Sequence, residues 1–181
     1  FMKKVIQAKV YVAMHNLAVG QAQQAFEEAF ILIEKNHSTD EKLYLKIKQL
    51  QASYFLHIGM VSRARGIMHD LLAIERTSSD KFDDNIRFNL FERAASLYIH
   101  SNHISPAIEY NRLAYNVADD MNNDKLRALA KINEAKLWFF SDINKSYKLM
   151  YEAKYYLEKK NVSRIECHNE LGILTAEMVL T

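Results

Sequence analysis

Gly59-Met-Val-Ser-Arg-Ala64 decides the fold, because two similar stretches occur elsewhere in the chain. They are Gly20-Gln-Ala-Gln-Gln-Ala25 and Asn102-His-Ile-Ser-Pro-Ala107. In each case the closing alanine lies twelve residues after another small residue, which is Ala13, Ala52 or Ala95. Small residues at a fixed spacing predict two antiparallel helices that approach closely at one point. The sequence therefore predicts helical hairpins that repeat along the chain.

Apolar residues recur at intervals of three and four along almost the whole chain. This is helical periodicity, and no stretch shows the sustained alternation of a strand. Only four glycines and one proline occur in 181 residues, which also favours helix. We expect an all-α chain of nine helices. Their expected positions are 3–19, 21–36, 40–58, 61–76, 80–101, 105–121, 124 to a break at 141–144, from that break to 160, and a ninth from 163.

Polar residues at the expected breaks predict where helices begin. Ser38 with Glu41, and Ser163 with Glu166, have the spacing of a capping box. Ser105-Pro106 predicts a cap followed by a proline in the first turn. Asn122-Asn-Asp124 is expected to open the seventh helix.

The equivalent small residues are Ala13, Ala52, Ala95, Ala135 and Gly172, and subtraction gives spacings of 39, 43, 40 and 37 residues. A bulky residue follows three positions later in three repeats, as Phe55, Tyr98 and Trp138. In the fourth repeat Ser146 replaces the second alanine and lies only eleven residues after Ala135. This spacing predicts a turn that is one residue shorter than in the other hairpins.

These features resemble the tetratricopeptide repeat family. The resemblance implies one domain, 1–181, folded as a right-handed α-solenoid of about four hairpins. Its repeats are 3–37, 40–77, 80–121 and 124–160, with a half-repeat or trailing helix at 163–181. The paired Leu-Gly and the terminal proline of the family are missing, and the period exceeds about 34 residues. The chain is more similar to the long repeats of bacterial signalling and transcription regulators, and we expect it to be part of a longer protein.

In this family the first helix of each hairpin lines a concave groove. The resemblance places these residues in the groove: Lys46, Gln49, Ser53 and His57 from the second repeat, Asn89, Glu92, Ser96 and His100 from the third, and Lys136 and Phe140 from the fourth. A groove that is polar in the middle and apolar at its ends suits an amphipathic helix or an extended peptide. Met14, Phe139 and Phe140 have a second interpretation as core contacts between repeats, which the sequence leaves open.

The resemblance implies a non-catalytic interaction and regulatory module that binds a protein or peptide. The chaperone-binding members clamp a terminal carboxylate with Lys and Asn, but the first-repeat equivalents are Val10 and Met14, so that partner class is excluded. An alternative is the sensory half of a response regulator, nucleotide cyclase or transcription factor whose output domain lies outside this chain. Self-association through the C-terminal helix is a third hypothesis. A stripe of Tyr147, Tyr151 and Tyr155 either packs under residues 164–171, which we expect, or stays open as a partner site.

Other function classes find little support in the sequence. No nucleophile, base and orienting group occur at a recognisable spacing, so we expect no enzyme and no cofactor. His100 with His103, and Cys167 with His168, lack the second ligand pair that a zinc site requires. The formal net charge is only +2 with interleaved signs, so no nucleic-acid partner is expected. Apolar runs such as Ala29 to Ile33 are too short for a membrane span, and the single cysteine is compatible with the cytoplasm.

Overall fold

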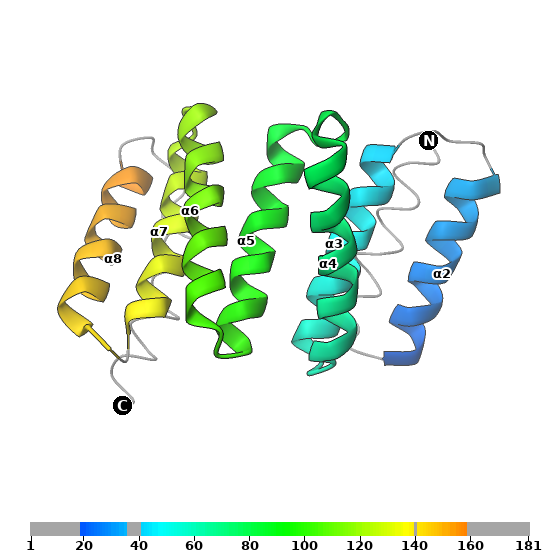
Figure 1. Ribbon diagram of the computed structural model, residues 1–181, viewed down its shortest axis with the longest axis horizontal. Helices are drawn as coiled ribbons and strands as arrows, with labels where there is room; N and C mark the ends of the chain where they lie inside the picture. Colours follow the sequence, from blue (N-terminus) through cyan, green and yellow to red (C-terminus); the bar gives the residue numbers. More distant parts are fainter. Residues whose placement is uncertain (1–18, 36–40, 140, 159–181) are drawn as a thin grey trace. The chain divides into compact units, whose positions relative to one another are not determined.

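The computed structural model describes residues 19–35, 41–139 and 141–158. Within these ranges every regular element is helical, which confirms the all-α prediction (Figure 1). The elements are α2 (Val19–Lys35), α3 (Glu41–His57), α4 (Val61–Thr77), the 3-10 turn η1 (Ser79–Lys81), α5 (Asp84–His100), α6 (Ile104–Asp120), α7 (Asp124–Trp138) and α8 (Ile143–Glu158). The first and ninth expected helices, and Ser38 and Ser163 of the expected capping boxes, lie outside the described residues.

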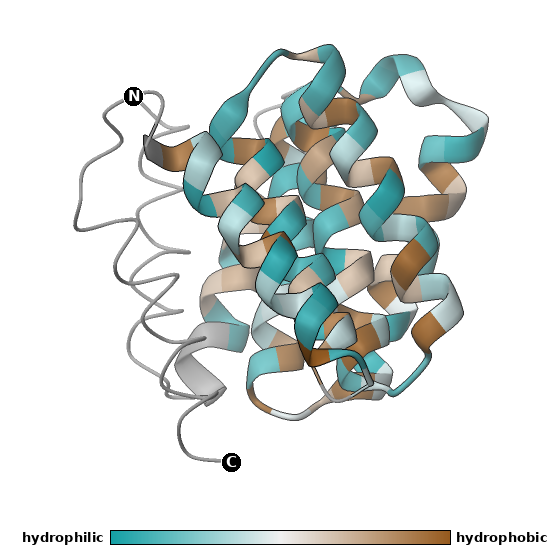
Figure 2. Cartoon of the chain, turned by 90° about the vertical axis from the view of Figure 1, so that its left-hand side faces the viewer, coloured by the Kyte–Doolittle hydropathy of each residue, from teal (hydrophilic) through white to brown (hydrophobic). Residues whose placement is uncertain are grey.

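The chain divides into two compact units, residues 1–93 and 94–181, and the division falls within α5. Buried side chains from every described helix form the interiors of the units. In the first unit the ring of Phe26 on α2 lies 5.8 Å from that of Tyr54 on α3. The core between α7 and α8 in the second consists of Ala128, Ile132, Ala135, Leu149, Met150, Ala153 and Leu157. Figure 2 shows hydrophobic and hydrophilic residues alternating along the described helices, as expected when each helix buries one stripe.

Small residues are buried where the helices of each hairpin meet. Ala52 and Ala64 are both buried within the α3–α4 hairpin, and Ala95 and Ala107 are buried in the second unit. In the α7–α8 hairpin the hydroxyl of Ser146 donates a hydrogen bond to the carbonyl oxygen of Ala135 at 2.9 Å. The predicted pairing of these two positions is therefore confirmed directly, and Ser146 fills the small-residue position with its hydroxyl satisfied.

The turns after α3 and α5 have the same hydrogen-bond pattern. Gly59 and Asn102 have φ angles of 78° and 55°, in the left-handed region that glycine and asparagine tolerate best. The next residue donates its backbone N–H to the carbonyl oxygen five positions back, from Met60 to Phe55 and from His103 to Tyr98, both at 2.8 Å. This is the Schellman motif, which satisfies carbonyls at a helix end and reverses the chain. The predicted turns at Gly59 and Asn102 are therefore confirmed as equivalents. The expected helix break near Gly20 is wrong, because α2 begins at Val19 and includes Gly20.

A third turn of this kind joins α6 to α7. Asn122 has a φ of 48°, and Asn123 donates its N–H to the carbonyl of Ala118 at 3.0 Å. The side chain of Asn123 then accepts a hydrogen bond from the N–H of Leu126 and caps α7. The expected helix start at 122–124 is confirmed.

The expected start of a helix near residue 80 is wrong by one turn. Residues Ser79–Lys81 form η1, and α5 begins only at Asp84. The side-chain carboxylate of Asp83 accepts a hydrogen bond from the N–H of Ile86 and fixes this start. Phe82, between the two elements, is buried in the first unit.

The expected cap at Ser105 is also wrong. The helix α6 begins at Ile104, and His103 occupies the N-cap position without a side-chain capping bond. Ser105 and Pro106 are therefore the second and third helical residues. The Schellman turn ends at His103, whose N–H donates to the Tyr98 carbonyl and whose backbone is not helical, so the helix begins at the next residue. Pro106 is tolerated because N–H groups in the first turn have no intrahelical partner.

The fourth hairpin differs from the others in its first helix, and the expected shorter turn is wrong. The helix α7 ends at Trp138, three residues after Ala135, whereas α3 ends at His57, five residues after Ala52. The connection to α8 spans residues 139–142 and is one residue longer than the connections at 58–60 and 101–103. The carboxylate of Asp142 accepts from the N–H of Lys145 and caps α8.

We expect Gly59→Ala to lower the free energy of unfolding by about 1 kcal/mol, because alanine adopts a left-handed conformation at a cost. An added Cβ at Gly59 meets no atom within 4 Å, so steric overlap adds nothing to this cost. Gly66 is the matched control, since its Cβ would also be free but it lies inside α4. Gly66→Ala should stabilise the chain by about 0.5–1 kcal/mol. Equal effects of the two substitutions in urea unfolding would contradict the turn geometry.

Candidate partner-binding surface

The helix α3 has buried side chains on several sides, and three of its expected groove residues share one more open face. The buried side chains are Leu43, Leu45, Ile47, Gln49, Ala52, Tyr54 and Phe55. Of the expected groove residues, Lys46 and His57 are exposed and Ser53 is half-buried. Residues 46, 53 and 57 share one face because helical positions three, four and seven apart align. The sequence correctly placed these three side chains on one face.

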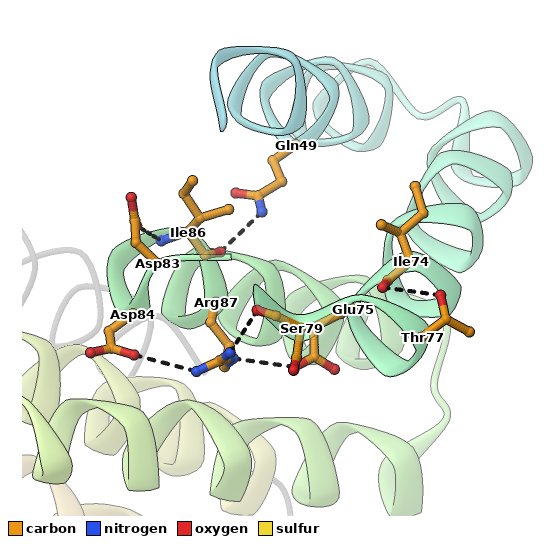
Figure 3. A network of polar contacts seen from close by, with 9 residues as sticks. All are labelled: Gln49, Ile74, Glu75, Thr77, Ser79, Asp83, Asp84, Ile86 and Arg87. Atoms are coloured by element: carbon orange, nitrogen blue, oxygen red, sulfur yellow. Dashed lines mark hydrogen bonds and ion pairs between the residues drawn. The ribbon is translucent and has the colours of Figure 1, made fainter. Parts of the chain in front are cut away.

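Gln49 does not belong to this surface, which corrects the sequence-based interpretation. Its side chain is only 2% exposed, and its amide nitrogen donates to the carbonyl oxygen of Ile86 on α5 at 3.0 Å (Figure 3). A buried amide bonded to the backbone of a neighbouring helix holds the two helices together. Gln49 is therefore unavailable to a partner.

Arg93 was missed by sequence reasoning and holds α3 and α5 in place within the first unit. One of its guanidinium nitrogens, Nη1, lies 2.7 Å from the Ser53 hydroxyl and 3.0 Å from the Gln49 carbonyl oxygen. The pairs Gln49–Ile86 and Ser53–Arg93 advance in the same direction along both helices. In the first unit α3 and α5 therefore run parallel where they touch. The only sequence signal was a long polar residue among the buried positions of α5.

The expected groove residues of α5 lie on one face of that helix. Asn89, Glu92 and Ser96 are half-buried, and His100 is exposed. The ring nitrogen Nδ1 of His100 lies 2.8 Å from the carbonyl oxygen of Ser96, so it donates in the tautomer protonated there. This face is polar and only partly open to solvent.

The fourth repeat contributes less to the candidate surface than expected. Lys136 on α7 is exposed, but Ile132, one turn before it, is buried in the core against α8. Phe140 lies outside the described residues.

Two arginines clamp the starts of α5 and α7 in the same way. Arg87 contacts the carboxylate of Asp84, three residues before it, and donates to the carbonyl of Ser79, eight residues before it, at 3.0 Å (Figure 3). Arg127 likewise contacts Asp124 at 2.7 Å and donates to the carbonyl of Asp119 at 3.2 Å. Arg87 also forms an ion pair with Glu75, and Arg127 forms one with the carboxylate of Asp119. These charges are occupied within the fold, so they are not free to bind a ligand.

Two tyrosines in the second unit lie within hydrogen-bond distance of each other, and the pKa of one of them is raised. The hydroxyls of Tyr115 on α6 and Tyr156 on α8 lie 3.2 Å apart. The hydrogen bond that Tyr115 shares with Tyr156 stabilises its neutral hydroxyl and, together with burial, raises the pKa of Tyr115 to about 12. The ammonium of Lys131 lies 4.9 Å from the centre of the Tyr115 ring and pairs with Glu152 at 2.9 Å. This cluster holds α6, α7 and α8 together.

The residues considered for catalysis or metal binding have structural partners. Nδ1 of His103 lies 2.7 Å from the carbonyl oxygen of Ser101. Asp83 caps α5 and Asp84 pairs with Arg87. Among the described residues, no group of three or more His, Cys, Asp or Glu side chains is close enough to hold a metal ion. Within the same ranges, no helix has the length and apolarity to cross a membrane.

We expect Arg93→Met to lower the free energy of unfolding by about 1–2 kcal/mol, because the bonds to Ser53 and to the Gln49 carbonyl are lost while the aliphatic stem remains. Arg112→Met is the control, because Arg112 is exposed on α6 and should change stability by less than about 0.5 kcal/mol. Equal losses in chemical denaturation would show that Arg93 does not hold α3 to α5.

We expect Tyr156→Phe to lower the pKa of Tyr115 from about 12 toward 10.0, because it removes the hydrogen bond that contributes most. The raised pKa also means that this tyrosine stabilises the fold below pH 10 and that the stability is lost as the pH rises through 12. NMR of ring-labelled tyrosine, assigned with Tyr115→Phe, measures the titration. Tyr151→Phe should leave it unchanged, and an unaltered Tyr115 titration in Tyr156→Phe would refute the contact.

Comparison of this chain with protein-family models, with curated proteins and with solved structures gives no match.

Proposed function

We propose that this chain is a non-catalytic protein-interaction module, and that the first unit binds an extended or helical segment of a partner. The proposed surface is the polar strip, defined as Lys46, Ser53 and His57 on α3 with Asn89 on α5. The observation that carries the proposal is the parallel contact of α3 with α5 through Gln49 and Arg93. Parallel first helices are what side-by-side stacking of hairpins requires. This supports the proposed right-handed solenoid of about four hairpins, with tetratricopeptide-like repeats.

The polar strip is held in position before any partner arrives. Ser53 donates to the Gln49 carbonyl at 3.2 Å and accepts from Arg93, so its hydroxyl has a fixed direction. The backbone beneath the strip is fixed by the buried Gln49 amide and by packing on several sides of α3. A preformed surface binds at a smaller entropic cost than a flexible one.

The side chains of the strip indicate the chemistry of the partner. Lys46 offers an exposed ammonium, and His57 and Asn89 offer ring and amide groups that can form hydrogen bonds. Such groups suit a peptide that presents backbone carbonyls, amide side chains and one or two carboxylates. A densely charged ligand is less suitable, because Arg87 is already paired within the fold. We further propose a cytoplasmic, regulatory role.

The test is quantitative affinity capture with the whole chain as bait. Lys46→Glu combined with Asn89→Ala should reduce recovery of the specific partner at least tenfold, because a required charge is reversed and a hydrogen-bonding group is lost. Arg65→Glu is the matched control, since Arg65 is exposed on α4, away from the strip. It should leave recovery unchanged, and circular dichroism should show all three chains equally folded. Equal recovery by the double variant and the wild-type chain would refute the proposed surface.

A further inference from the structure

We draw no further inference here: the strongest candidate, the surface patch of exposed side chains Ile143, Tyr147, Tyr151 and Tyr155 along α8, carries none because nothing in the described part of the structure shows what covers it.

Discussion

The close approach of two helices at a small residue is the constraint on which the rest of this structure depends. Ala52, Ala64, Ala95, Ala107 and Ala135 are all buried, and Ser146 takes the remaining position with its hydroxyl bonded across the hairpin. A larger side chain at any of these points would separate the helices and remove the close packing around them. The left-handed turns at Gly59 and Asn102 then determine where each second helix begins.

Sequence reasoning succeeded where one residue decides a local geometry. Gly59 and Asn102 are types that adopt positive φ easily, and Asn123 is a strong N-cap, so these turns were predictable. The match of Ser146 to Ala135 succeeded because the small-residue pattern tolerates a change of spacing. The prediction was wrong in assigning the shorter spacing to the turn, since it is the helix α7 that is shorter. A spacing gives only the sum of helix and turn lengths, so it cannot show that α7 ends early.

Sequence reasoning failed where a partner distant in sequence decides the outcome. Ser105 follows the capping pattern, but the preceding Schellman turn fixes the start of α6 at Ile104. Gln49 has the pattern of an exposed groove position, yet it is buried because α5 packs against α3 at Ile86. Arg87 and Arg127 each bond to one residue three positions earlier and to a carbonyl oxygen eight positions earlier. The second contact depends on the conformation of the turn between the helices, which the sequence alone does not specify.

The first and second helices of a hairpin differ in what surrounds their open faces. The open face of α3 is bordered by Gln49 and Ser53, whose side chains have fixed hydrogen-bond partners on α5. The second helices α4, α6 and α8 expose equivalent positions, as Arg65, Arg112 and Tyr151 show. Because these positions lie outside the core, the repeat places little constraint on which side chain stands there.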